Sequence, residues 1–497
     1  MQKLYKTAAV LTAAAALLTG CSAQDVSTDE NSSIAVESVP SAPETTSTPE
    51  ENSTPDETNS RSDFLNDLIS SVRDKEPPES RPQDSGNGKL TILCWDSNDE
   101  AQNMADAFLD YKGYDSDKIE VVSLDVSDYQ IYDEYKNYVA GDNDVDIFVI
   151  SPDDISKFVY DESLTMPLNE LGLSRADFPN AYEYTFDLCT NGNGELRALC
   201  YNACPGAFVY RADLARQYLG VNSPEEMQEL IGSWDSFQQT GTRLRAASGG
   251  KIALQSSVAG MLQAYICGKT QPWVMNGEKL TLGGCIPFYE MAKSMKSNGS
   301  LADIPIWDEQ WFDSLYNGIA LGEFLPTWGL GVDEGAVLNT LAHGFSGNTE
   351  TVELAICQGP AAWYWGGAYL GVSQKCNDPE LAKEFLEFMC ADDETMDYYY
   401  YEWTTNDSFI NNSAVIGSYY NYNSLLQDSQ DTNTILDEQA RNVRISGTVT
   451  KYDDTLDVLF FQSVLDYLDG TARDVNEAAQ IFIDNALAAY PELTASE

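Results

Sequence analysis

The sequence predicts an α/β protein, and three observations support that prediction. Residues 90–95 (LTILCW) and 145–151 (VDIFVIS) are continuous apolar runs, typical of strands buried on both faces of a sheet. Residues 119–124 form a third strand-like run between them. Apolar residues at helical spacing separate the three runs, over 101–113 and again over 129–140. Strand, helix, strand, helix and strand in this order predict a parallel sheet covered by helices.

Similar patterns continue toward the C-terminus. Residues 370–373 (LGVS) are expected to end a strand, and Asp378 followed by Pro379 supplies the N-cap and first turn of a helix. A helix rich in Leu and Phe is expected to run up to Gly470, and another to start near Asp474. Ligands of open α/β folds bind where the parallel strands end, so we look for a site there.

Composition excludes several classes of function. A net charge of −51 over 497 residues excludes a nucleic-acid binder that works by neutralising phosphates. The single histidine, His343, excludes a multi-histidine metal centre, and no G-x-S-x-G elbow accompanies it. No phosphate-binding loop of the form GxxxxGK[ST] is present either. The pairs Asp153-Asp154 and Asp453-Asp454 are expected by chance among 79 acidic residues, so we expect neither catalysis, a cofactor nor a metal.

The N-terminus is expected to be an export signal followed by a spacer. Lys3 and Lys6 precede an apolar stretch that is too short to cross a bilayer as a helix. The letters LTGC at 18–21 resemble a bacterial lipobox, and by that resemblance residues 1–20 are removed and Cys21 carries the lipid. Residues 21–88 are rich in Ser, Thr, Pro and Glu, which predicts a disordered spacer that holds a domain away from the membrane.

Nine of the ten cysteines remain after Cys21 is set aside, and an odd number does not form a complete disulfide set. Cys94, Cys357 and Cys390 lie among apolar residues and are expected in the core. A bridge from Cys189 to either Cys200 or Cys204 stays open at this point.

The tryptophans are the more informative residues. Trp95 ends the first predicted strand, Trp328 lies in PTWG, and Trp363 and Trp365 lie in WYWGG. A Trp at a strand end or beside glycine is well placed to offer a flat face in a cleft. Sugar rings have apolar faces that stack on such side chains, while carboxylates and amides bond their hydroxyls. The alternative for each tryptophan is simple core packing.

Taken together, the chain resembles the extracellular solute-binding proteins of ABC importers, in the sugar-binding group that includes maltose-binding protein. The resemblance covers roughly residues 89–490. It rests on ordered segments: 90–95, 144–148 (DVDIF), 205–214 (PGAFVYRADL), 318–328, 366–372, 378–388 and 465–478. The resemblance implies an α/β, two-lobed periplasmic-binding-protein-like fold with a ligand cleft between the lobes, which closes by hinge motion.

The resemblance also implies domain limits and cleft residues. It places one lobe at 89–200 plus 360–398 and the other at 205–357 plus 403–497, with crossings near 200–205, 357–360 and 398–403. The residues that it assigns to the cleft are Trp95, Asp96, residues 151–154 with Asp153 and Asp154, Trp328, and residues 363–366 with Trp363, Trp365 and Gly366. Trp403, which follows a Tyr-rich stretch, is a further candidate for the ligand site.

The function that follows is capture of a carbohydrate and its delivery to an ABC-type permease. We expect a monomer, tethered to the outer face of the cell membrane by its N-terminal lipid, with no nucleic-acid partner. Two other classes of function stay open. One is a surface glycoside hydrolase or lectin, and the other is a binding protein for a peptide or polyamine.

Overall fold

The computed structural model describes residues 88–95, 100–124, 131–141, 143–404 and 408–495. The expected signal, the lipid-carrying Cys21, the spacer up to residue 87 and the cleft residue Asp96 lie outside these residues. Within the described segments, no helix has both the length and the apolar composition needed to cross a bilayer.

The first sheet has five strands in the order β2-β1-β3-β11-β4. Its strands are β1 (Leu90–Cys94), β2 (Ile119–Ser123), β3 (Ile147–Ile150), β4 (Ala198–Asn202) and β11 (Ala368–Val372). β1 pairs in parallel with both β2 and β3, which confirms the predicted parallel core. The whole sheet is mixed, because β11 is antiparallel to both of its neighbours. β11 runs the other way because it brings the chain back from a second sheet.

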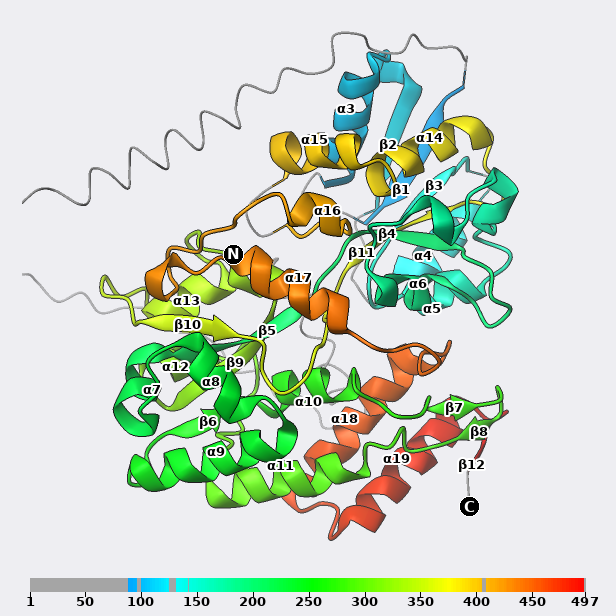
Figure 1. Cartoon of the computed structure of the whole chain (residues 1–497). Coiled ribbons are helices and arrows are strands. Elements are labelled where there is room, and N and C mark those ends of the chain that lie inside the picture. Colours follow the sequence, from blue (N-terminus) through cyan, green and yellow to red (C-terminus); the bar gives the residue numbers. More distant parts are fainter. Residues whose placement is uncertain (1–87, 96–99, 125–130, 142, 405–407, 496–497) are drawn as a thin grey trace, which may run out of the picture. The chain divides into compact units, whose positions relative to one another are not determined.

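Helices cover the first sheet and, with it, form the first lobe (Figure 1). Phe108 packs edge-on against Phe385 and Phe388, with ring centroids 5.3 and 5.4 Å away. The Asp378 side chain accepts a hydrogen bond from the Leu381 amide, as expected of the predicted N-cap. The helices of this part of the chain are α3 (Glu100–Lys112), η1 (Ser116–Lys118), α4 (Ile131–Ala140), α5 (Ile155–Tyr160), η3 (Leu168–Leu171), η4 (Arg175–Asp177), α6 (Glu183–Cys189), α14 (Pro379–Cys390) and α15 (Asp393–Trp403).

The second lobe is built on a four-stranded sheet in the order β10-β5-β9-β6. Its strands are β5 (Gly206–Arg211), β6 (Ala253–Gln255), β9 (Ala320–Pro326) and β10 (Leu354–Cys357). A small third sheet joins β7 (Val274–Met275), β8 (Lys279–Leu280) and β12 (Thr494–Ala495). The helices between these strands are α7 (Ala212–Leu219), α8 (Pro224–Ile231), α9 (Trp234–Ala247), α10 (Val258–Ile266), α11 (Ile286–Asn298), α12 (Glu309–Tyr316), η5 (Thr327–Leu330) and α13 (Val337–His343).

Two C-terminal helices complete the second lobe. α18 (Asp453–Asp469) packs on α10, α11 and α19 (Val475–Ala489). α18 ends at Gly470, which takes a left-handed conformation with φ of 93°, and Asp474 caps α19 by accepting from the Glu477 amide. Both predicted helix boundaries are therefore confirmed.

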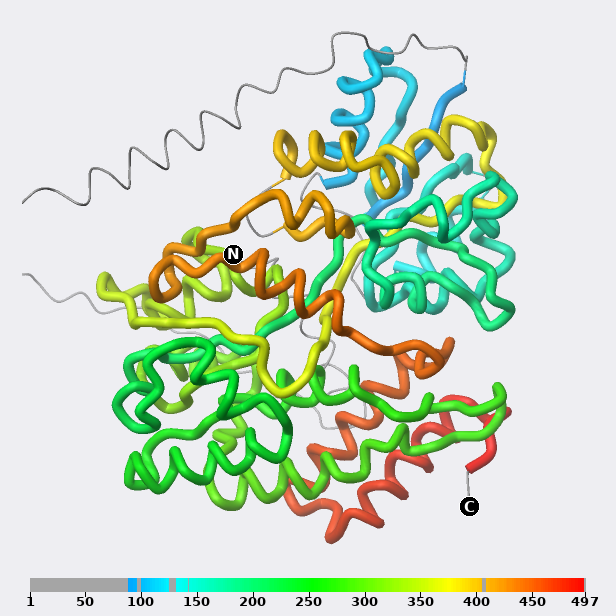
Figure 2. The backbone as a smooth tube through the Cα atoms, in the orientation of Figure 1, coloured from blue at the N-terminus to red at the C-terminus, as the bar shows by residue number. Residues whose placement is uncertain are grey.

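Two segments carry the chain between the sheets, and they lie side by side (Figure 2). The outgoing segment joins β4 to β5, and the returning segment, residues 358–367, joins β10 to β11. The Gly206 amide donates to the Trp363 carbonyl (3.0 Å), and the Trp365 amide donates to the Cys204 carbonyl (2.9 Å). These bonds hold the returning segment directly against the outgoing one.

The third passage between the lobes comes after α16 (Ser413–Ile416), later than the predicted 398–403. α15 still packs on α3 and α14, and the Asn411 side chain donates to the Cys200 carbonyl. After η6 (Gln427–Ser429), α17 (Thr432–Asn442) packs on β5. There Gln439 donates to the carbonyls of Gly206 (2.7 Å) and Gln358 (2.8 Å). The exact lobe limits stay a prediction.

The nine described cysteines are all free thiols, and eight of them are buried. The structure therefore contains neither of the bridges considered for Cys189. Burial raises the pKa of the Cys189 and Cys200 thiols well above the ordinary value, so both stay protonated at neutral pH.

Candidate ligand-binding site

Three half-buried tryptophans meet where the returning segment passes the end of β9. Trp365 belongs to the returning segment, Trp328 to η5, and Trp307 to the loop before α12. We call these three residues the tryptophan cluster. Trp307 and Trp328 lie nearly parallel, with ring centroids 5.9 Å apart and an interplanar angle of 24°. Trp365 meets Trp328 edge-on at 5.6 Å, so the cluster presents aromatic faces in two orientations.

The backbone next to the cluster requires glycine. Gly366 and Gly367 have φ of 109° and 119°, a region that residues with a side chain rarely adopt. A Cβ at Gly366 would also lie 3.1 Å from Nε1 of Trp328. That indole N–H donates to the carbonyl of Trp365 over 3.0 Å, which fixes the two rings against each other. The glycine pair in WYWGG therefore lets Trp328 approach the returning segment closely.

Trp307 is held in an unusual conformation. Its φ is 74°, which is an outlier for a bulky side chain and costs on the order of 1–3 kcal/mol. Its indole N–H is buried and has no hydrogen-bond partner among the described residues. Strained backbone and unpaired buried donors are both concentrated at functional sites, because function can require a geometry that stability alone would not select.

A second group of side chains connects the two lobes on the other side of the returning segment. We call Ser156, Lys269, Asp453, Asp454 and Asp457 the acidic cluster. The Ser156 hydroxyl, on α5 of the first lobe, donates to Asp454 on α18 of the second. Lys269 pairs with Asp453 (2.6 Å) and Asp457 (3.5 Å).

Burial governs the electrostatics of the acidic cluster. It raises the pKa of the Asp454 carboxyl well above the usual range, and the neighbouring Asp453 raises it further. Burial also raises the pKa of Asp457, although Lys269 opposes that shift. Burial alone would lower the pKa of Lys269, but the Asp453 and Asp457 charges outweigh it and raise that pKa. Two carboxyls, Asp453 and Asp457, thus share one buried ammonium group, and Asp454 lies beside them, so a hydroxyl or amine from a ligand would find acceptors there.

Tyr364 directly precedes Trp365 in the returning segment, and its side chain lies near the acidic cluster. Its ring stacks on Tyr184 of α6, with centroids 5.0 Å apart. Burial raises the pKa of the Tyr364 hydroxyl well above its ordinary value, and Cys267, Asp457 and Asp453 add to the shift. Two consecutive residues of the returning segment therefore have different neighbours. Tyr364 lies near the carboxyls of the acidic cluster, and Trp365 packs on the rings of the tryptophan cluster.

The predicted cleft residues of the first lobe lie at the ends of its strands. Trp95, half-buried, directly follows β1. Asp153 and Asp154 follow β3, and Asp153 contributes its charge to the environment of Asp454. Asp154 is 1% exposed and binds Lys157 through one oxygen (2.5 Å), while its other oxygen has no hydrogen-bond partner in the part of the chain that the structure describes.

The structure brings together Trp328, Trp365 and Gly366, but not all of the predicted tryptophans. Trp363 is fully buried and packs on Gly206 and on the ring of Phe324, so in this structure it belongs to the packing between the crossing segments. Trp403 lies on α15, where its indole N–H donates to the Tyr398 hydroxyl.

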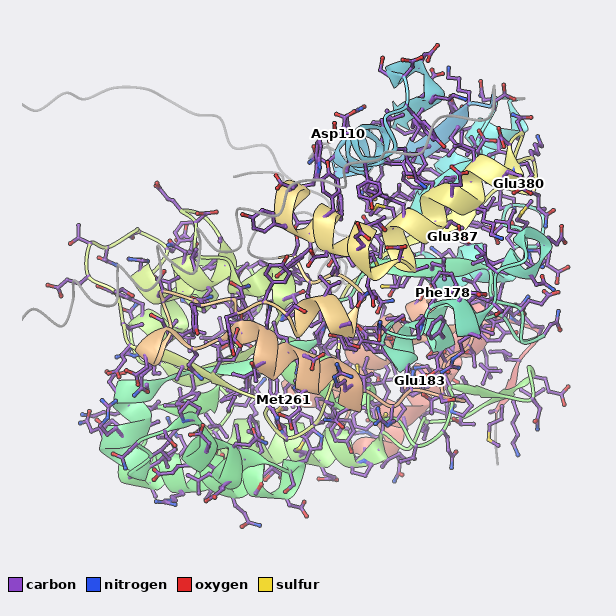
Figure 3. All side chains as sticks on the ribbon, turned by 45° about the horizontal axis from the view of Figure 1, so that its top comes forward. Asp110, Phe178, Glu183, Met261, Glu380 and Glu387 are labelled. Carbon is purple, nitrogen blue, oxygen red and sulfur yellow. The ribbon has the colours of Figure 1, made fainter. Side chains whose placement is uncertain are left out.

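That hydroxyl in turn donates to Asp110 on α3 (2.7 Å; Asp110 is labelled in Figure 3). Trp403 is therefore part of a network on the first lobe, and it has no ring contact with the tryptophan cluster.

Sequence reasoning did not assign Trp307, Lys269 or Asp457 to the site, and it included Tyr364 only as part of the segment 363–366. Asp457 carried a usable signal, because it follows Asp453 by four residues and so lies on the same face of the helix. Trp307 carried none, since its place depends on a left-handed backbone that composition does not reveal.

A cavity of about 410 Å³ lies elsewhere in the first lobe, and its lining includes Lys89, Glu120 and Asp146. These residues lie at or before the amino ends of the parallel strands, whereas ligands of such folds bind beyond the carboxyl ends. None of the predicted cleft residues lines this cavity. Among the described residues, no group of three or more His, Cys, Asp or Glu side chains could hold a metal ion.

Comparison with known proteins places this arrangement in a family. A solved extracellular solute-binding protein of family 1 superposes with a TM-score of 0.68 at 17% identity, covering 81% of this chain and 99% of the other. The sugar-binding protein MalE of Xanthomonas citri gives 0.61 at 12% identity, covering 81% and 98%. The cyclic alpha-maltosyl-1,6-maltose binding protein of Arthrobacter globiformis gives 0.59 at 14% identity, covering 81% and 99%.

These likenesses establish a two-lobed binding-protein fold. A search of curated proteins finds no significant match. The family model described as bacterial extracellular solute-binding protein matches residues 103–415, which is well over half of the sequence. The chain therefore belongs to the family of bacterial extracellular solute-binding proteins.

Proposed function

We propose that this protein captures a carbohydrate between its lobes and delivers it to an ABC-type permease. The observation that carries the proposal is the tryptophan cluster, in which the returning segment and the second lobe contribute half-buried aromatic rings to one place. Aromatic faces stack on the apolar faces of sugar rings, and nearby carboxyls accept hydrogen bonds from sugar hydroxyls. The similar structures described as binding maltose-type or other sugars support the same ligand class.

The direct test is to find the ligand and show that the cluster binds it. We would screen the folded chain on a glycan array, identify copurified ligand by native mass spectrometry, and measure affinities of the hits by calorimetry. Trp365→Ala should lose most of the affinity, whereas Trp234→Ala should bind normally. Trp234 is a matched control, because it is also half-buried but packs on Phe237 and Tyr265 of the second lobe. Tight binding of peptides or polyamines but of no glycan would overturn the proposal.

The same samples separate binding from catalysis. A binding protein returns its glycan unchanged, whereas a hydrolase shortens it. We therefore expect mass spectrometry to recover the intact oligosaccharide after long incubation. Shortened products in the wild-type sample, and their loss on replacing a carboxyl of the acidic cluster, would instead indicate a glycoside hydrolase.

The proposal includes a lipid anchor at Cys21 and a location on the outer face of the cell membrane. The lipobox-like letters at 18–21 and the basic residues before them support it. Cys21→Ser should release the protein from membranes without changing its glycan affinity. Full retention of this variant in salt-washed membranes would contradict the anchor while leaving the carbohydrate proposal intact.

A further inference from the structure

Glu323, in the middle of β9, is a fully buried carboxyl that receives four hydrogen bonds. One oxygen accepts from the Gln255 side chain (2.5 Å) and from the Phe324 amide (3.0 Å). The other accepts from the Ser256 hydroxyl and from the Trp311 indole (2.9 Å). The side chain is 0% exposed, and no salt bridge is formed by it among the described residues. A buried carboxyl without a cation is costly, so its presence calls for an explanation.

The contacts of Glu323 lead to the tryptophan cluster. Trp311, which the carboxyl holds through its indole N–H, packs on Trp307 with ring centroids 5.2 Å apart. Trp307 stacks on Trp328, and Trp328 is bonded to Trp365. An unbroken series of packed rings therefore joins the carboxyl to the proposed sugar-binding faces. Trp307 has a strained backbone, so its ring position depends on what packs behind it.

Both protonation states of Glu323 fit the pocket, but they hold Trp311 differently. The carboxylate accepts all four bonds, and an ionised acceptor makes the bond from the indole stronger. The protonated carboxyl can donate to the Ser256 oxygen, since a serine hydroxyl can reverse its role. The bond from Trp311 then weakens. Burial raises the pKa of Glu323 to about 8, so both forms are populated near neutral pH.

We propose that Glu323 is a positioning residue that makes ligand affinity depend on pH by controlling how firmly Trp311 supports the tryptophan cluster. This inference rests on the proposed carbohydrate function. In the carboxylate form, Trp311 and Trp307 are pre-organised behind Trp328, and a pre-organised site binds more tightly. Affinity should therefore rise with pH.

Other ionisable groups on the surrounding elements have to be separated from Glu323. The residues that touch it from β6, α10 and α12 carry no charge: Gln255, Ser256, Gly260 and Trp311. The elements packed on β9 also carry the ionisable residues Tyr210, Arg211, Tyr265, Glu309, Asp313 and Tyr316. Of these, Arg211 binds Asp213 and Asp313 accepts from the Phe345 amide, so both are engaged elsewhere. His343 ends α13, which packs on α12, and its ring faces the Asn339 carbonyl.

The test compares the wild type with Glu323→Gln and with Glu309→Gln, an exposed carboxyl on the same helix as Trp311. The affinity for a glycan hit would be measured by calorimetry from pH 6 to pH 9. We expect the wild type and Glu309→Gln to bind roughly fivefold more tightly at the high end. Glu323→Gln should show a flat profile, and His343→Gln should keep the wild-type slope. An equal slope in the wild type and Glu323→Gln would overturn the inference.

A ligand-free measurement makes this test independent of the sugar. Near-ultraviolet circular dichroism of the wild type should titrate near pH 8, and this transition should be absent in Glu323→Gln. If Glu323→Gln does not fold, Trp311→Phe removes the indole N–H, while keeping a smaller aromatic ring in its place, and should also flatten the affinity profile. If no glycan binds the wild type, the carbohydrate proposal fails. The dichroism alone then tests whether the protonation of Glu323 changes the packing of the tryptophan cluster. A dichroism transition that persists in Glu323→Gln would contradict it.

Discussion

The tryptophan cluster and the acidic cluster lie on either side of one short segment but are built in opposite ways. The tryptophan cluster is neutral and half-buried, and its rings come from the returning segment and the second lobe only. The acidic cluster is charged, and its bond from Ser156 to Asp454 joins α5 of the first lobe to α18 of the second. Neutral faces can bind a ligand before the lobes close, whereas bonds between the lobes form only when they are together.

This difference separates two roles. Under the proposed function, the accessible rings determine how strongly a sugar is held, because stacking does not require the opposite lobe. Buried polar pairs between the lobes stabilise the closed form. Removing these groups from water costs free energy, and only their contact with each other offsets that cost. Substitutions in the two clusters should therefore change different measurements.

The largest effect in the acidic cluster should come from removing its only ammonium group. Lys269→Met leaves the buried Asp453 and the half-buried Asp457 without their cation, which should cost about 3–5 kcal/mol of unfolding free energy. Urea denaturation at pH 7 measures it. Lys89→Met is the matched control, since its ion pair with Glu120 is exposed and screened by water, so its loss should change stability far less. Equal losses of unfolding free energy in the two variants would contradict the claim that the buried ion pairs of Lys269 matter more than a surface pair.

The next effect concerns how pH changes the free energy of unfolding through Glu323, the carboxyl behind the tryptophan cluster. Unfolded Glu323 titrates near its ordinary pKa of 4.5, whereas the folded pKa is about 8. Between these values the folded form keeps a proton that the unfolded form has lost, so raising the pH favours unfolding. This contribution is complete below about pH 4.5 and is lost as the pH rises through 8.

Glu323→Gln should therefore gain stability over the wild type at pH 9 relative to pH 5, by roughly 4 kcal/mol, because nearly three pH units separate pH 5 from the folded pKa and each contributes about 1.4 kcal/mol. Thermal denaturation at the two pH values measures the difference. If the stability gap between the two proteins is the same at both pH values, Glu323 is ionised throughout and the assignment is wrong.

The smallest effect should come from the bond between the lobes. Ser156→Ala leaves the Asp454 carboxyl without its hydroxyl donor, which should cost about 1–2 kcal/mol. Small-angle scattering of the ligand-free protein should show a larger radius of gyration, because the closed form loses support. Ser163→Ala serves as the control, since that serine is exposed and bonds Asp161 within the same lobe. An unchanged scattering curve for Ser156→Ala would mean that this bond does not control closure.

Much of the fold could be predicted from the sequence, because local signals determine its parts. Continuous apolar runs located β1 and β3, and Asp378 and Asp474 located the starts of two helices. The direction of β11 could not be read in this way. It depends on the path of the chain through the second sheet, which no local pattern encodes.

The same distinction applies to the candidate site: some of its residues carry a local signal in the sequence, and others do not. Trp328 and Trp365 were predicted because a Trp beside glycine is a local signal. Trp363 shows the limit of that signal, since it lies in the same WYWGG motif yet is fully buried. The bond from Ser156 to Asp454 joins residues 298 positions apart, and such a contact is created by folding alone.

The most direct test of the account compares Trp363 and Trp365, two residues apart in one segment. For Trp365→Ala we expect a glycan affinity roughly tenfold to a hundredfold lower, with a nearly unchanged melting temperature. For Trp363→Ala we expect a loss of about 3–5 kcal/mol in unfolding free energy, because its fully buried ring fills the space between the crossing segments. Normal affinity in Trp365→Ala, or a melting temperature lowered as far as in Trp363→Ala, would contradict the claim that the tryptophan cluster binds the ligand.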